Sequence, residues 1–404
     1  MLDIVVFGAS GFTGKFVVRY LAEKRWWSTS PHDFTLGVAG RDPEKLRDVV
    51  TAYCGTRSHL VPITVADCSD PASLARMAKS CRVLVNCVGP YTLYGESVVA
   101  ACVAAGTSCL DISGESNYMD LMRSKYAQDA HISGSIIISA CGFDSVPNDF
   151  GFTLMRQKLG PDATAIDSYI EGDTGAQGAG VHVTTLHSLL EAVTDFKYIA
   201  KKLSSQPRLT GQRVIPHTDS RLPGKVIVPF PGADAEIVDR SWSLSEAPKF
   251  KRGLYVALRS WSEFSMLAIG VVVIIILTLV PGMKSLIVRY PHWFTFGVVT
   301  ANGPSDKQRN GTKATVHVFG RSSGGRKHRL AVTLTDPGYG ATAAIIGQGA
   351  LTLAMRRDSE LPLKYKNSGG FLTPAHAFVE RNGEKSDVIT ALNRSNLVRI
   401  SFIE

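Results

Sequence analysis

Hydrophobic residues in the first third of the chain form short blocks that end at glycine, proline or polar residues. The first block, Ile4–Phe7, runs into a glycine-rich turn and then into a longer apolar segment of helical character. Strands that alternate with helices through short connections are typical of a doubly wound, mostly parallel sheet. The pattern therefore predicts a Rossmann-like α/β domain over about residues 1–150. Its further strands are expected at Phe34–Ala39, Ile63–Ala66, Val83–Val88, Ser108–Asp111 and Ile136–Ala140, with a helix over Val98–Ala105.

The turn after the first strand carries glycine at every third position, as Gly8, Gly11 and Gly14. Between a strand and a helix, such glycines allow a tight turn, let the backbone approach a pyrophosphate and let the helix lie close to the sheet. The spacing is looser than that of the G-x-G-x-x-G fingerprint, but its place between a strand and a helix predicts a dinucleotide site. The residues expected to bind the cofactor here are Gly8, Ser10, Gly11, Phe12, Thr13 and Gly14.

The end of the second strand indicates which dinucleotide is bound. An acidic residue at this place favours NAD through the ribose 2′-hydroxyl, but this chain has Arg41. A guanidinium pairs well with a 2′-phosphate, so NADP is favoured over NAD. The alternative is that Arg41 only pairs with Asp42 or Glu44 beside it.

Ligands of doubly wound sheets bind beyond the carboxyl ends of the strands. Further cofactor contacts are therefore expected at Asp67, after the third strand, and at Cys87, Val88, Gly89 and Pro90, after the fourth. A reductase that forms an enolate needs a hydrogen-bond donor for the enolate oxygen. The catalytic candidates by position are Tyr91, Tyr94 and Glu115, followed by Asp144. Each has a structural alternative: Tyr91 packs under the cofactor, Glu115 caps a helix or ties loops together, and Asp144 caps the helix after Pro147.

An apolar segment over residues 264–283 contains no charged residue between Glu263 and Lys284. It is about as long as a helix that crosses a hydrocarbon core. Three interpretations remain open: monotopic insertion into one leaflet, burial in a soluble core, or a spanning helix. Monotopic insertion is favoured because it keeps both flanks on one side of the membrane. Interface aromatics and cations flank the segment, namely Trp261, Lys284, Arg289, Tyr290, His292 and Trp293.

Residues 151–335 are expected to form a second, α+β domain that supplies the substrate side and the membrane contact. A strand is predicted at Ala165–Ile170 and a helix from near Val181, followed by a long connection over residues 204–231. Alternating residues predict an antiparallel hairpin of Thr315–Gly320 and Leu330–Thr335. A helix over Ala341–Met355 is rich in small residues. An alternative to a simple two-domain division is that residues 336–404 return to complete the first domain.

Composition narrows the function classes. The chain has 404 residues, 45% of them hydrophobic, and a formal net charge of +9, with the basic residues scattered and no nucleic-acid motif. Nucleic acid is therefore not an expected partner. The seven cysteines are odd in number and lack metal-ligand spacing, so no metal site is expected and a reducing compartment is indicated. No secretory signal is expected, because the first residues form a buried strand. Oligomeric state is not indicated.

Several blocks together resemble the saccharopine dehydrogenase-like oxidoreductases, a family that includes trans-acting enoyl reductases. The matching blocks are residues 5–14, 39–41, 86–91, 95–96, 111–115, 141–147, 303–305 and 370–374. The resemblance implies an oxidoreductase, and eukaryotic members of the family are associated with lipid droplets and membranes. It is not specific for a reaction.

The leading hypothesis is reduction of an enoyl or keto group on a lipid-like substrate at a membrane or lipid-droplet surface facing a reducing compartment. Two alternatives remain open. One is a saccharopine-type amino-acid dehydrogenase, which would need cationic groups for the substrate carboxylates. The other is a non-catalytic nucleotide-binding protein of membranes or lipid droplets.

Overall fold

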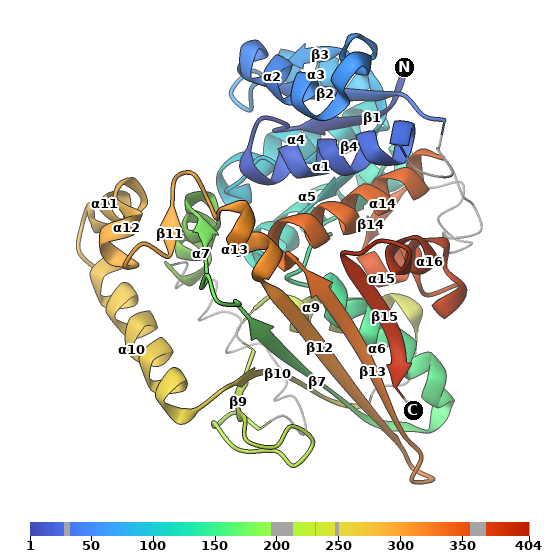
Figure 1. Cartoon of the computed structure of the whole chain (residues 1–404). Helices are drawn as coiled ribbons and strands as arrows, with labels where there is room; N and C mark the ends of the chain where they lie inside the picture. The colour runs from blue at the N-terminus through green and yellow to red at the C-terminus, as the bar shows by residue number, and fades with distance from the viewer. Residues whose placement is uncertain (28–32, 195–212, 231, 247–249, 356–368, 404) are drawn as a thin grey trace.

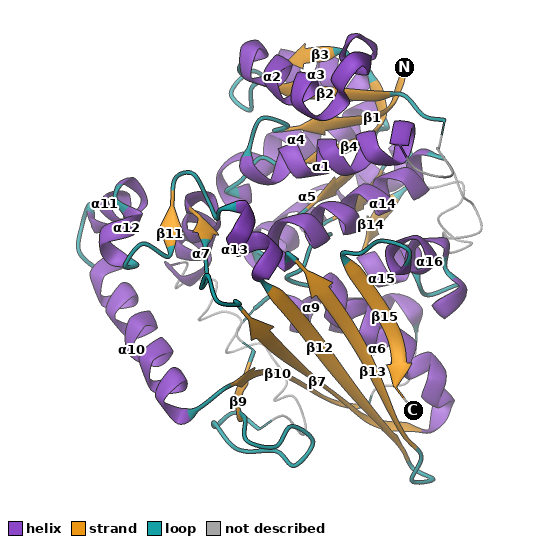
Figure 2. Ribbon diagram, viewed as in Figure 1, coloured by secondary structure: helices purple, strands orange, loops and turns teal. Residues whose placement is uncertain are grey.

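The computed structural model describes residues 1–27, 33–194, 213–230, 232–246, 250–355 and 369–403 (Figure 1). Two large sheets organise these residues, as Figure 2 shows. The first has seven strands in the order β14-β6-β5-β4-β1-β2-β3, and every pairing in it is parallel. Its strands are β1 Leu2–Phe7, β2 Leu36–Gly40, β3 Ile63–Val65, β4 Cys81–Asn86, β5 Ser108–Asp111, β6 Ile136–Ile138 and β14 Gly370–Leu372.

Alternate side chains of each central strand pack toward opposite faces of this sheet. In β1, Ile4 and Val6 join one hydrophobic cluster, while Val5 and Phe7 join the other. The helices of the first half are α1 Phe12–Ala22, α2 Pro43–Cys54, α3 Pro71–Lys79, α4 Tyr91–Ala105, α5 Ser116–Ser133 and α6 Val146–Leu159. This doubly wound arrangement confirms the predicted fold class.

The C-terminal part of the chain returns to the first sheet. Strand β14 pairs with β6, and helix α14 (Thr342–Ala354) contacts α1 and β4. All thirteen residues of α14 are buried. Its glycines allow close packing, because a Cβ on Gly347 would lie 2.6 Å from the ring of Tyr20. The domain limits 1–150 and 151–335 stay a prediction, as does the completion of the first domain by residues 336–404.

The second sheet has six strands in the order β15-β13-β12-β7-β10-β9. Only its β10–β7 pairing is parallel. Helix α6 packs against β12, β13 and β7 and so joins this sheet to the first half of the chain. The strands are β7 Ala163–Asp173, β9 Val226–Pro229, β10 Lys251–Leu258, β12 Lys313–Ser322, β13 Lys327–Thr335 and β15 Val398–Ile403, and the helices nearby are α9 Asp234–Ser245, α15 Pro374–Phe378 and α16 Asp387–Asn393.

The hairpin predicted around Thr315–Gly320 and Leu330–Thr335 is confirmed as β12 and β13. The long connection predicted over residues 204–231 is wrong in part, because β9 lies within it and pairs with β10. Strand β9 has only four residues between segments rich in glycine and proline, so it gives no periodic pattern in the sequence. Its pairing with β10 holds it in the sheet. Residues 195–212 and 231 lie outside the described part of the chain.

A third region projects from the side of the molecule as an arm (Figure 1). It consists of α10 Trp261–Thr278, α11 Met283–Arg289 and α12 Pro291–Phe294, and it follows β10. The chain then returns through β11 (Val299–Thr300), which pairs with β8 (Val181–His182) just before α7 (Val183–Thr194), and continues into α13 (Asp306–Gly311). A small cluster of Leu186, Leu190, Ile287 and Val299 joins α7 to the arm.

None of the eighteen residues of α10 is buried, so the soluble-core interpretation of this apolar segment is wrong. By length and composition alone, α10 is the one helix of the described residues that could cross a membrane. Its flanking strands β10 and β11 pair with β7 and β8 of the same body.

Candidate active site

The glycine-rich turn has the geometry of a phosphate cradle at the start of α1. Gly8 has φ +78°, a left-handed conformation that side chains disfavour. A Cβ on Gly14 would lie 2.2 Å from the carbonyl oxygen of Gly8, so only glycine lets α1 start this close to the turn. Gly11 is the N-cap of α1, and no side chain caps the helix there. The first N–H groups of α1 are therefore available to an anion, with the helix dipole favouring negative charge.

The loops after β1 and β4 meet beside this cradle. A Cβ on Gly8 would lie 2.8 Å from Cγ2 of Val88, and the Cys87 amide donates to the carbonyl of Phe7 at 2.9 Å. Because the sheet order reverses direction between β1 and β4, this is the crevice in which doubly wound folds bind dinucleotides. The predicted contacts Cys87, Val88, Gly89 and Pro90 all lie here, directly after β4.

Arg41 lies exposed at the end of β2 and forms no ion pair with the described residues. Its neighbours are engaged elsewhere: Asp42 caps α2 by accepting from the amides of Glu44 and Lys45. The pairing with Asp42 or Glu44 that the sequence left open is therefore not formed. Asp67, after β3, accepts from the Ser69 amide at 2.8 Å, which lowers the pKa of its carboxyl, and the positive charge of Arg41 lowers it further.

The structure brings Tyr91 and Glu115 together, but the contacts between them stabilise the start of helix α4. Glu115 is buried, and its two carboxylate oxygens accept from the backbone amides of Tyr91 and Thr92 at 2.9 and 2.7 Å. It therefore caps the N-terminus of α4, as its structural alternative predicted. The buried Tyr91 hydroxyl donates to the Asn86 carbonyl at 3.0 Å, and burial together with the charge of Asp111 raises its pKa well above the usual range.

Tyr94 is 44% exposed on α4. The catalytic roles of Tyr91, Tyr94 and Glu115 stay predictions. The contacts described above occupy the polar atoms of Tyr91 and Glu115.

Three glycines mark the edge of the sheet on the side of β4, β5 and β6, and each lies against a polar side chain from another segment. A Cβ on Gly89 would lie 3.7 Å from Oγ of Ser188 in α7, and one on Gly114 would lie 3.1 Å from Oδ2 of Asp144. Thr342 of α14 lies in the same way against Gly142, and its hydroxyl accepts from the Phe143 amide at 3.0 Å. Sequence analysis missed Ser188 and Thr342, because only the fold places their helices beside these loops.

The second half of the chain also closes over the start of α1. The Phe12 ring stacks on His182 of β8 with ring centroids 5.0 Å apart, and Tyr339 packs edge-on at 4.8 Å. A Cβ on Gly303 would lie 2.7 Å from the Phe12 ring. Burial lowers the pKa of His182, which favours its neutral form. The turn that follows the arm therefore contacts the phosphate cradle directly.

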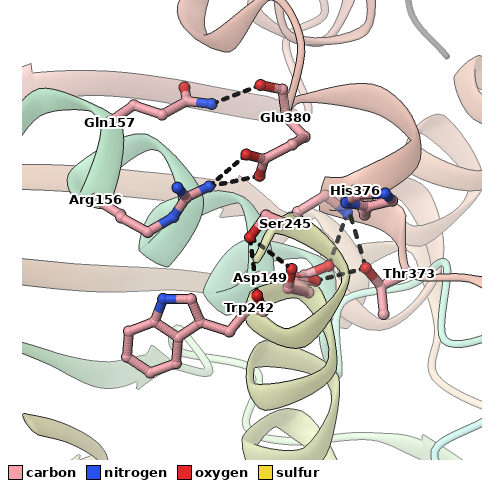
Figure 3. A network of polar contacts seen from close by, with 10 residues as sticks. Asp149, Arg156, Gln157, Trp242, Ser245, Thr373, His376 and Glu380 are labelled. Atoms are coloured by element: carbon pink, nitrogen blue, oxygen red, sulfur yellow. Dashed lines mark hydrogen bonds and ion pairs between the residues drawn. The ribbon is translucent and has the colours of Figure 1, made fainter. Parts of the chain in front are cut away.

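A buried polar network joins α6, α9 and α15 (Figure 3). The carboxylate of Asp149 accepts from the Ser241 hydroxyl and from the Ala375 amide, and burial raises its pKa to about 7. Nearby, Arg156 donates to both carboxylate oxygens of Glu380 at 2.6 Å. The network fixes the helices that connect the two sheets, and its engaged atoms indicate a structural role.

The cradle, the uncapped helix N-terminus and the unpaired Arg41 fit NADP. When bound, its nicotinamide ring supplies a hydride. No group of three or more histidine, cysteine or acidic side chains that could hold a metal ion occurs among the described residues.

Comparison with known proteins gives the same assignment. The family model of the saccharopine dehydrogenase NADP-binding domain matches residues 4–138. A Rattus norvegicus saccharopine dehydrogenase-like oxidoreductase is 32% identical over 98% of this chain and 96% of its own length. A Caenorhabditis elegans protein named lipid droplet localized protein is 32% identical, covering 93% of each chain. The apo saccharopine dehydrogenase (L-Glu forming) of Saccharomyces cerevisiae aligns over 100% of both chains with a TM-score of 0.57 at 12% identity, which shows a shared fold. The sequence resemblance and the NADP assignment are thereby confirmed, and the chain belongs to the saccharopine dehydrogenase-like oxidoreductases.

Proposed function

We propose that this NADP-dependent oxidoreductase reduces an enoyl or keto group of a lipid-like substrate, and that α10 holds it on a membrane or lipid-droplet surface. The observation that carries the proposal is that α10 has no charged residue after Glu263 and that none of its residues is buried. Exposed apolar patches of this extent mark interaction surfaces. Val273 is 47% exposed and Ile276 57% exposed, both near the middle of the helix.

The arm is suited to one leaflet. Its flanking strands belong to one body, so a spanning α10 would require the bilayer to pass through paired strands. Exposed aromatic residues at its ends are suited to the membrane interface: Trp261, Trp293 and Phe296, the last of them 96% exposed. The C. elegans relative, named for lipid droplets, supports the same kind of surface.

The side chains nearest to three glycines at this edge of the sheet include no cation, which argues against a substrate bound through its carboxylates. The side chains against Gly89, Gly114 and Gly142 are those of Tyr91, Ser188, Asp144, Thr342 and Ile112, with no cation among them. An amino-acid dehydrogenase would need cations there to bind the substrate carboxylates. Helix α7 also connects this edge to the arm, since Ser188 lies at Gly89 while Leu186 and Leu190 join the cluster with Ile287 of α11. A lipid held at the arm would thus lie near Gly89, at the edge of the first sheet where we propose that the substrate is reduced.

Membrane binding is tested by flotation with phosphatidylcholine vesicles and with purified lipid droplets. Replacing Val273 and Ile276 by Lys should leave the protein folded and able to bind NADPH but unable to float. The matched control replaces Leu60 and Ile132 by Lys. These residues are 48% and 73% exposed on the cofactor half, so the control variant should still float. Failure of the unmutated protein to bind either surface would overturn the membrane proposal.

Substrate class is tested separately. The protein is incubated with a total lipid extract and NADPH deuterated at C4, and lipids that gain deuterium are identified by mass spectrometry. Transfer to a lipid enone or ketone is the expected result. Transfer only to water-soluble imino acids formed from added amino acids and oxoacids would indicate the amino-acid dehydrogenase instead.

A further inference from the structure

Asp144 differs from the other acidic residues at the edge of the first sheet because its carboxylate has no hydrogen-bond partner among the described residues. It follows β6 and precedes α6, whose N-cap Ser145 makes no side-chain capping bond. The capping role that the sequence allowed for Asp144 is therefore wrong. Glu115, which the sequence ranked first, has both oxygens engaged at the N-terminus of α4. Of the two acids, Asp144 is therefore the one whose carboxylate is free to react.

The position of Asp144 suits contact with the nicotinamide half of the cofactor. Its Oδ2 would lie 3.1 Å from a Cβ on Gly114, at the end of β5. With Arg41 at the end of β2 on the adenosine side of the crevice, the nicotinamide half extends across β4 toward β5. The Asp144 side chain is exposed to solvent, yet the protein around its carboxyl desolvates it and raises its pKa.

A second acid lies behind Asp144. Asp234, at the start of α9, is 1% exposed, and one of its oxygens accepts from the Asn148 amide group while the other, Oδ1, has no partner within the described residues. Burial raises the pKa of Asp234 well above its usual range, and the nearby charges of Asp144 and Asp149 raise it further. The adjacent Ser145 hydroxyl is also buried without a partner in the same part of the structure. These unpaired groups point to a site built to hold a proton.

We infer that Asp144 is the proton donor of the reaction and that Asp234 is a positioning residue behind it. As hydride reaches the carbon of the substrate double bond, the displaced electron pair moves to the substrate oxygen. Asp144 gives its carboxyl proton to that oxygen and becomes a carboxylate. Because Asp144 is exposed, solvent water returns a proton to it. With a ketone this gives the alcohol, and with an enone it gives the enol, which loses its O–H proton to water and gains a proton at Cα to become the saturated ketone. The role rests on the oxidoreductase chemistry rather than on the lipid.

A substrate-free measurement tests the placement. Aspartate carboxyls are labelled with ¹³C, and the Asp144 signal is assigned by its loss in Asp144→Asn. The pH titration is compared with bound NADP⁺ and with the acid-stable tetrahydro form of NADPH, whose ring is neutral. A positive ring within about 6 Å should lower the Asp144 pKa by about 1 unit or more relative to the neutral ring. Asp42, on the adenosine side, is the internal control and should titrate identically in both complexes. Equal Asp144 titrations would overturn the inference.

A kinetic arm tests the role once a reduced substrate is identified. Asp144→Asn should lower kcat by about 10²- to 10⁴-fold, the range for loss of a general acid, while the Kd for NADPH changes less than about twofold. Asp144→Glu should recover part of the rate with a shifted pH profile. Asp144→Asn is expected to fold normally, because the carboxylate makes no hydrogen bond to the described residues. Full activity of Asp144→Asn would exclude the role. If no lipid is reduced even by the unmutated protein, the lipid proposal fails while the titration still decides the placement of Asp144.

Discussion

Two apolar helices of this molecule have opposite surroundings. Every residue of α14 is buried against the first sheet and α1, whereas no residue of α10 is buried. Helix α14 is rich in alanine, glycine and threonine, which let other segments approach closely, while most of the central residues of α10 are valine, isoleucine and leucine that no segment buries. Two helices of similar hydrophobicity can therefore have opposite burial, and only the packing of the fold separates them.

The largest expected effect comes from placing a charge in the buried helix. Ile346 of α14 is 0% exposed, so Ile346→Lys forces an unpaired ammonium into the core. We expect a loss of about 4 kcal/mol or more in the free energy of unfolding, measured by urea denaturation, with aggregation at 37 °C. A cooperative transition at the unmutated midpoint would show that α14 is not packed as described.

A second effect should separate the cofactor site from folding. A valine side chain at Gly11 would fill the space between the turn and a bound pyrophosphate, so Gly11→Val should abolish NADPH binding in calorimetry. Far-ultraviolet circular dichroism should remain that of a folded protein, since a Cβ at Gly11 meets only the Gly8 carbonyl oxygen, at 3.0 Å. Retained binding would limit the glycines to a packing role.

A third effect tests whether the exposed Arg41 of the cofactor half contacts the 2′-phosphate of NADPH. Arg41→Ala should weaken NADPH binding by about 1 to 3 kcal/mol through loss of a charge-assisted contact and leave NADH binding nearly unchanged. Fluorescence titration with both nucleotides measures the difference. Equal losses for NADPH and NADH would contradict the assignment of Arg41 to the 2′-phosphate.

The smallest expected effect is the counterpart of the first. Ile276 is exposed, so Ile276→Lys in α10 should change the free energy of unfolding in lipid-free buffer by no more than about 0.5 kcal/mol. NADPH affinity should stay the same. A loss comparable with that of Ile346→Lys would mean that another protein surface covers α10 in solution, and the contrast between the helices would disappear.

Local signals made the cofactor half predictable. The turn from Gly8 to Gly14 and the strand Ser108–Asp111 follow from residues close in sequence, and β5 has the predicted bounds. The position of Arg41 directly after β2 could be predicted from sequence, and this is where the fold brings a residue to the adenosine ribose.

The arrangement of the reacting edge could not be predicted in the same way. Whether Glu115 or Asp144 is engaged depends on which helix N-terminus lies beside it, and this is set by packing between segments far apart in sequence. Ser188 could not be predicted from sequence, because only the fold places its helix against the loop that contains Gly89. The apolar segment was recognised from sequence, but only the fold distinguishes an exposed helix from a buried one.

The return of β14 to the first sheet affects how the chain is made. Strand β14 begins at Gly370, yet it pairs with β6 of the N-terminal half, and α14 covers β4 only after Thr342 has been added. Chains fold from the N-terminus as the ribosome extends them. Helix α10, which ends at Thr278, thus leaves the ribosome before the cofactor sheet can be completed. The apolar face of that sheet and the apolar arm are therefore exposed together during this interval, so aggregation is a hazard of synthesis until residues after Thr342 have been added.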